Sequence, residues 1–513
     1  MSRRWRWTLG ALAFLIVLVT VVPILAERPL RRVAERQLNA CVHGYSARIG
    51  GLDVRPLGLS VHLRDLDIVQ DAHPDTPLVR IPRVSTDLRL APLLRGRLVA
   101  GILVIGAQVD AGRAQVVHAL ENPQVVVKDC TLAKLLEFMH AIDLFRLRDA
   151  SVDYAEAGPS TLRALNMDVR NIRIAASGPD VYPSPLTLEA VMIGGRLRVD
   201  GAADLLREPY PAFKGRLELT RVALDQLGPL AAPYGLSVTR GTFSVAGSVE
   251  YSPEVTVVDL DYVNLDGVQA DYAYRKISAQ PVKEAADLAR HGINAPNVRL
   301  AARRISINGA TLGFVNESAR PRYRVYLSDI DAQMENFTNQ QTEATMTARV
   351  TARFMGSGET EVTATIRPGS DGPDFQLSSR IEQVDVRRMN DLLRAHGGID
   401  VASGLFSVYS ELRVKNGRVD GYVKPLIHDL KVYEPQLDHE KSVGQRIKEK
   451  AANIVSKLLR NRQRQDIATI TPIVGPLENP KAGTWTTMVN LVQNAFFKAI
   501  LPGFVGDEAG ASR

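Results

Sequence analysis

Apolar and polar residues alternate with a period of two along most of the chain. The alternation is clear at residues 59–64, 84–90, 350–354 and 406–414. A period of two puts all the apolar side chains on one face of a strand. Strands with one apolar and one polar face are typical of antiparallel sheets, and turn signals such as Asn416-Gly417 separate them. The sequence therefore predicts a mainly β fold with minor α, built on an antiparallel sheet.

The chain also contains an internal repeat. Residues 216–250 resemble residues 380–412 once a one-residue insertion is allowed. We expect each copy to form a strand, a short helix, a glycine and then a pair of strands that begins Gly-x-Phe-Ser-Val, at Gly241 and at Gly404. Repeated β units predict an elongated structure in which each unit packs mainly on its neighbours.

Helical periodicity replaces the alternation in four places. Residues 28–41 have apolar positions at helical spacing on one side and arginine and glutamate on the other, which predicts a short amphipathic helix. The other helices are predicted at residues 283–290, 439–464 and 485–501. The last of these either caps the sheet or touches a membrane or a partner.

An uncharged apolar segment lies near the N-terminus, at residues 8–26. As a helix it covers about 29 Å, close to the hydrocarbon thickness of a bilayer. A cleavable signal peptide is the alternative, but its apolar core is usually shorter and ends in small residues, whereas Ile24 is bulky. We therefore predict a retained transmembrane anchor. The residues predicted to form this anchor are Trp7, Leu12, Phe14, Leu15, Ile16, Leu18, Val22 and Ile24.

Composition and charge narrow the class of protein. Hydrophobic residues make up 45% of the chain and charged residues 23%, which excludes both a disordered chain and a polytopic membrane protein. The net charge of +7 is small for 513 residues. The arginines are scattered singly along the expected strands rather than gathered in a stripe with aromatic residues, so we expect no nucleic-acid partner.

The sequence holds no recognisable catalytic or metal-binding motif. The nine histidines include no pair at metal-ligand spacing. Nucleophile elbows, phosphate-binding loops and dinucleotide fingerprints are all missing from the sequence. Asp65-Leu-Asp67 and Asp259-Leu-Asp261 place paired carboxylates on one strand face, but the alternation assigns that face to water. We therefore predict no catalysis, no metal and no cofactor.

Only two cysteines are present, Cys41 and Cys130. Two cysteines are too few for a metal framework. In an oxidising compartment they form one disulfide, and the other possibility is a pair of unlinked, buried thiols.

The order of short motifs resembles the AsmA-like family of Gram-negative envelope proteins, in a branch described as a domain of unknown function. Near the N-terminus an anchor, a short helix and Gly44 lead into characteristic strand motifs. Near the C-terminus, two proline-containing runs precede Trp485. The motifs that carry the resemblance are residues 59–68, 77–81, 90–98, 107–110, 419–426 and 470–477.

The resemblance implies a single-pass inner-membrane protein with most of its chain in the periplasm. It also implies a groove-like β-sheet, related to bridge-like lipid transfer proteins, that binds or conducts phospholipid during envelope maintenance and outer membrane biogenesis. On this basis we divide the chain into a cytoplasmic tip and anchor (1–26), an amphipathic linker helix (27–43), an AsmA-like β region (44–175), a repeated β region (176–435) and a C-terminal helical region (436–513).

Aliphatic and aromatic positions at strand spacing are the candidate lining of such a groove. From the residues alone, they form a closed sandwich core equally well. The alternative function is then that of a structural or assembly factor that binds other envelope proteins without lipid. The candidate lining residues are Leu59, Val61, Leu63, Leu217, Leu219, Phe243, Val245, Phe406 and Val408.

Overall fold

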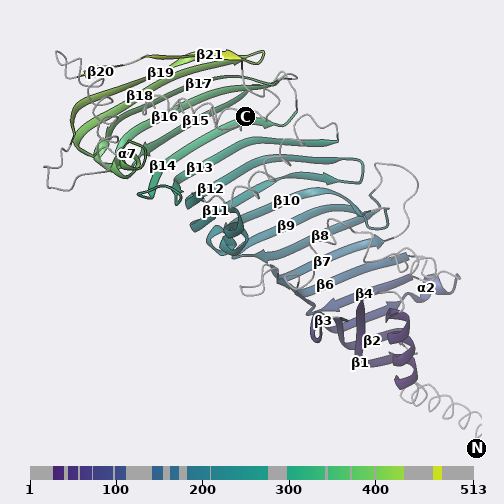
Figure 1. The fold of residues 1–513 in the computed structure, drawn as a ribbon. Helices are drawn as coiled ribbons and strands as arrows, with labels where there is room; N and C mark the ends of the chain where they lie inside the picture. The colour runs from purple at the N-terminus through teal and green to yellow at the C-terminus, as the bar shows by residue number, and fades with distance from the viewer. Residues whose placement is uncertain are drawn as a thin grey trace, which may run out of the picture. The chain divides into compact units, whose positions relative to one another are not determined.

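The computed structural model confirms that the protein is mainly β, with antiparallel pairing between most neighbouring strands and few helices (Figure 1). The predicted anchor, the predicted helices at residues 283–290, 439–464 and 485–501, and both cysteines lie outside the described residues. In the part of the chain that the structure describes, no helix has the length and apolarity needed to cross a membrane. The structure describes residues 27–39, 44–55, 58–71, 73–95, 99–110, 141–153, 162–172, 182–207, 210–274, 297–340, 345–369, 372–397, 400–432, 466–468 and 470–476.

The chain divides into two compact units. The first comprises Met1–Val222 and Ser248–Thr256, and the second comprises Ala223–Gly247 and Val257–Arg513. The boundary falls inside the repeated β region predicted from the sequence.

In the first unit, a helix at residues 27–39 precedes the strands. Consecutive strands pair antiparallel along most of the unit. The exception is β6, which runs parallel to both β4 and β5. The elements are β1 (Tyr45–Arg55), β2 (Ser60–Gln70), β3 (His73–Leu88), α2 (Leu90–Leu93), β4 (Val99–Ile105), β5 (Gln108–Asp110), β6 (Ala141–Asp153), β7 (Leu162–Ile172), β8 (Ser184–Met192), β9 (Gly195–Asp204) and β10 (Ala212–Ala223).

In the second unit, the strands from β13 to β19 pair in chain order and antiparallel. Both β20 and β21 pair with β19. These two strands lie in the C-terminal region (436–513) that the sequence predicts to be helical, between its two predicted helices. The elements are η3 (Leu224–Leu227), α5 (Gly228–Ala231), η4 (Ala232–Tyr234), β11 (Leu236–Tyr251), β12 (Thr256–Tyr274), β13 (Val298–Asn316), β14 (Tyr323–Thr338), β15 (Met346–Phe354), β16 (Gly358–Gly369), β17 (Gly372–Asp385), η5 (Val386–Met389), α7 (Asn390–Gly397), β18 (Val401–Lys415), β19 (Arg418–Val432), β20 (Asp466–Ala468) and β21 (Thr471–Pro476). The tip of the β11–β12 hairpin belongs to the first unit.

The two copies of the sequence repeat fold into the same succession of elements. A strand leads into a 3-10 turn, a short helix and a second strand, once from β10 to β11 and once from β17 to β18. The equivalent glycines Gly241 and Gly404 both adopt positive φ, at 130° and 151°. At Gly241 a Cβ atom would lie 2.8 Å from the Cα of Val268, so both the backbone conformation and the close approach require glycine.

Many strands carry a β-bulge. At the bulge one residue has positive φ, and the register with the neighbouring strand shifts. A bulge bends a strand and increases its twist, so a series of bulges curves a sheet. The residue that follows the bulge is buried in β6, β13, β14 and β17. The bulged residues are Asp149 and Ala164 in the first unit, and Gly309, Asp329, Gln383 and Asp429 in the second.

Candidate functional site

The candidate site is the apolar face of the strands, where the sequence places the groove lining. In β2, Leu63 lies opposite Leu52 of β1 and opposite Val84 of β3. Val61 occupies the next position on the same face and is half-buried, as is Leu59, whose carbonyl accepts a hydrogen bond from the Leu88 N–H at 2.9 Å. Val61 and Leu63 therefore share one face of β2, whereas Leu59 lies just before the strand at positive φ.

The β10 candidates lie elsewhere in the first unit. Leu217 is opposite Val199, and Leu219 is opposite Leu197, both on β9. Leu217 packs against a buried cluster that includes Val169. The β2 and β10 candidates thus contact different neighbours and do not form one local site.

The β11 and β18 candidates differ in their surroundings although both follow the repeated Gly-x-Phe-Ser-Val motif. Phe243 is half-buried and Val245 is buried. Phe406 and Val408, by contrast, belong to a cluster closed by residues of η5 and α7, the turn and helix that precede β18. That cluster includes Val384, Val386, Met389 of η5, and Leu392 of α7. Phe406 is only 3% exposed, which is the environment of a packed core.

A more open stretch of the apolar face lies on β13, at residues that the sequence reading did not select. Leu312 alternates with Ala310 and Phe314, lies opposite Leu327 of β14, and is 44% exposed. Nearby, the ring of Phe314 lies 6.0 Å from that of Tyr272, in the range of favourable aromatic pairs. The alternation in residues 310–314 is a signal that could have identified this strand.

The polar face of the second unit is crossed by ion pairs. Arg349 reaches Glu361 at 2.9 Å, and Arg380 bonds the other oxygen of Glu361 at 3.0 Å. The hydroxyl of Tyr409 donates to Glu382 at 2.6 Å. This hydrogen bond, together with partial burial, raises the pKa of Tyr409 above its ordinary value. The face assigned to water is thus held by side-chain pairs that run from strand to strand.

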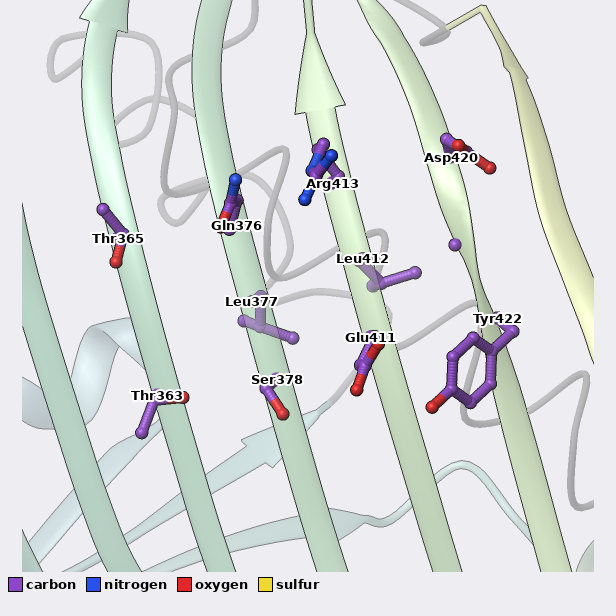
Figure 2. Close-up of a pocket in the computed structure, with 11 residues that line it drawn as sticks. Thr363, Thr365, Gln376, Leu377, Ser378, Glu411, Leu412, Arg413, Asp420 and Tyr422 are labelled. Atoms are coloured by element: carbon purple, nitrogen blue, oxygen red, sulfur yellow. The ribbon is translucent and has the colours of Figure 1, made fainter.

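Next to this network the polar face has a hollow of about 470 Å³ over β16 to β19 (Figure 2). The strand register places its polar side chains in two rows across the four strands. The first row contains Thr363, Ser378, Glu411 and Tyr422, and the second contains Thr365, Gln376, Arg413 and Asp420. Most of these side chains are exposed, so the hollow is part of the solvated face.

Among the residues that the structure describes, no group of three His, Cys, Asp or Glu side chains is placed to hold a metal ion. The lowered pKa values of Asp385 and Glu254 have local causes, namely the hydrogen bond from Arg387 to Asp385 and the one from Ser252 to Glu254. The Asp385 carboxylate also accepts the backbone N–H of Arg387 and so caps η5, whereas the Glu254 carboxylate pairs with Arg207 at 3.1 Å.

Comparison with known proteins adds no family assignment, because the sequence matches no protein-family model and no curated protein.

Proposed function

We propose that this chain is a non-catalytic envelope protein that holds phospholipid on the apolar face of its β-sheet. Residues 8–26 would anchor it in the inner membrane, with most of the chain in the periplasm. The proposal rests on one observation: Leu312 is nearly half exposed on the apolar face of a strand whose opposite face is polar. The resemblance to the AsmA-like family supplies the compartment and the envelope-maintenance role.

The physical basis is transfer of acyl chains from water to an apolar surface. Each methylene group buried contributes about 0.8 kcal/mol. Aliphatic side chains suit this task because they offer contact without directional bonds, so an acyl chain is held loosely enough to slide. The headgroup stays in water at the rim.

In the second unit, we place the candidate lipid-binding surface away from Phe406 and Val408. Phe406 and Val408 pack beneath η5 and α7, so we assign them to structural packing. The lipid-binding surface is assigned instead to half-exposed residues of β12 to β14, with Leu312 at its centre. Its other members are Leu265, Ile307 and Leu327, which pack on the buried residues Val268, Ala310 and Ile330.

The opposite face of the same strands is suited to water. Arg303 pairs with Asp261 at 3.4 Å, and Arg324 pairs with Asp271 at 2.8 Å. The Arg324 guanidinium also lies 4.6 Å from the centroid of the Tyr326 ring. Ion pairs on one face and aliphatic residues on the other give the sheet one side on which an acyl chain is stable.

The experiment compares lipid content in matched variants of the full chain, purified in detergent from an envelope-bearing host. Leu312→Asp places a charge on the apolar face at a position that is already partly exposed. Gln333→Asp is the control, because Gln333 is exposed on the polar face opposite Arg349. Both variants keep the predicted anchor and therefore any lipid that surrounds it. We expect extracted phospholipid per chain to fall in Leu312→Asp alone.

The alternative function, an assembly factor that binds other envelope proteins, is favoured by the closed cluster beneath η5 and α7. If the whole apolar face is packed in this way, no lipid is needed to cover it. A folded Leu312→Asp variant with the same lipid content as the wild type and the Gln333→Asp control would contradict the lipid proposal and support the assembly factor.

A further inference from the structure

The first strand of the sheet has a helix along one of its two edges. Among the described strands, β1 pairs with β2 alone. Its other edge faces the helix at residues 27–39 (Figure 1). An unpaired strand edge carries a row of N–H and C=O groups that is open to pairing with another strand.

Side chains of the helix occupy these backbone groups. The amide of Asn39 binds both the N–H and the carbonyl of Ala47, at 2.5 and 3.2 Å, as a strand residue would. The Glu35 carboxylate accepts the N–H of Ile49 at 2.9 Å. Each of these backbone groups would otherwise be available to a neighbouring strand.

Two more hydrogen bonds join the helix to β1, closer to the start of the helix. The Arg31 guanidinium donates to the carbonyl of Gly50 at 3.0 Å. The carboxylate of Glu27 accepts from the N–H of Leu52 at 3.4 Å. Side chains of the helix therefore bond to the backbone of β1 from residue 47 to residue 52.

The spacing explains why a helix can replace a strand here. The four helix residues that make these bonds, at 27, 31, 35 and 39, recur every fourth position. Four residues of an α-helix rise about 6 Å, and two residues of a strand span about 6.8 Å. Successive helical turns therefore stay in step with successive outward backbone groups of β1, and helix and strand run in opposite directions.

The orientation of the helix supports this role. Its polar stripe faces the strand, while Leu30 and Val33 are 41% and 47% exposed. An amphipathic helix that covered a hydrophobic core would do the opposite. The contact is thus made mainly by polar side chains directed at backbone groups.

We propose that the helix at residues 27–39 is a cap that withholds a strand-addition surface on β1. The partner excluded by the cap is the β1 edge of a second copy of this chain. Two identical edges pair antiparallel around a two-fold axis, and the pairing would use the N–H groups of Ala47, Ile49 and Leu52. This inference does not depend on lipid binding.

The test removes the cap from the full chain in detergent. The double variant Glu35→Ala/Asn39→Ala deletes the side-chain partners of Ala47 and Ile49. The control Arg32→Ala/Arg36→Ala alters two exposed residues of the same helix. Molar mass is measured by light scattering over a hundredfold range of protein concentration. We expect the mass of the uncapped variant to double as concentration rises, while the control follows the wild type.

A third substitution identifies the surface responsible. Proline at position 49, in the uncapped background, removes an N–H that points away from β2 and so spares the β1–β2 pairing. We expect Ile49→Pro to reverse the association. The proposal is overturned if the uncapped chain keeps wild-type mass and wild-type strand signal in circular dichroism. If the double variant does not fold, Asn39→Leu alone removes both bonds to Ala47 and is judged by the same criteria.

Discussion

The loss of stability on truncating Phe406 distinguishes a packed core from an open lipid-binding surface. The Phe406 side chain is 3% exposed and lies in a cluster closed by η5 and α7. Truncation of a fully buried phenylalanine costs about 3–5 kcal/mol, because the apolar contacts are lost and a cavity remains. We therefore expect Phe406→Ala to lower the free energy of unfolding by that amount.

Leu312→Ala is the matched comparison in the same unit. Leu312 is 44% exposed, so alanine removes few contacts and leaves no enclosed cavity. Full burial of a leucine contributes about 1.5–3 kcal/mol, and we expect a loss of about 1 kcal/mol or less at this half-exposed position. The difference between the two variants measures how closed each part of the apolar face is.

The assay is urea unfolding of the full chain in detergent, followed by far-ultraviolet circular dichroism. The three tryptophans lie at positions 5, 7 and 485, outside the described strands, so tryptophan fluorescence does not report on the sheet directly. Both substitutions lie in the second unit, and the transition of that unit is compared. Equal, small losses in the two variants would refute the assignment of Phe406 to a packed core.

Three further predictions concern the backbone and the pH dependence of stability. Gly241→Ala should destabilise by about 2–4 kcal/mol in the same urea assay, because φ is 130° and a Cβ would lie 2.8 Å from a β12 backbone carbon; no loss would contradict the close approach. Ser407→Ala should cost about 1 kcal/mol because its hydroxyl accepts a backbone N–H, whereas Ser410→Ala should be neutral or stabilising because its buried hydroxyl has no partner among the described residues; the reverse order would refute this. Arg387 holds the pKa of Asp385 below its ordinary value, so its contribution is complete above the unfolded pKa of about 3.9 and lost as pH falls through the folded pKa. The stability gap between wild type and Asp385→Asn should therefore shrink in acid, and a gap independent of pH between 2 and 7 would exclude it.

Strand positions were predictable because alternation is a local property of the chain. The repeat was visible for the same reason, and its two positive-φ glycines occupy equivalent places. The bulges were not predicted. Their signal is a one-residue slip in the alternation, as around Asp149 and Asp329, where an aspartate tolerates positive φ better than most residues.

The environment of each apolar side chain could not be predicted from its own strand. Phe243 and Phe406 share one motif, yet one is half-buried and the other is enclosed. The difference depends on what other segments contribute, including Met389 and Leu392 beneath which Phe406 packs. The alternation within one strand does not show which distant segments pack against it.

The role of the polar stripe on the N-terminal helix could not be predicted from the sequence for a related reason. The sequence shows an amphipathic helix, and it does not show which face makes contact. Glu35 and Asn39 have partners because β1 lies at a sheet edge, which only the strand pairing reveals.

The most direct test of lipid binding on the apolar face is photo-crosslinking in living cells. A photoreactive phenylalanine analogue is placed at position 312, on the apolar face, or at position 333, on the polar face. If the apolar face binds lipid, phospholipid is covalently attached at position 312 and none at position 333. A folded protein that yields no phospholipid adduct at position 312, or yields equal adducts at both positions, would contradict lipid binding on the apolar face.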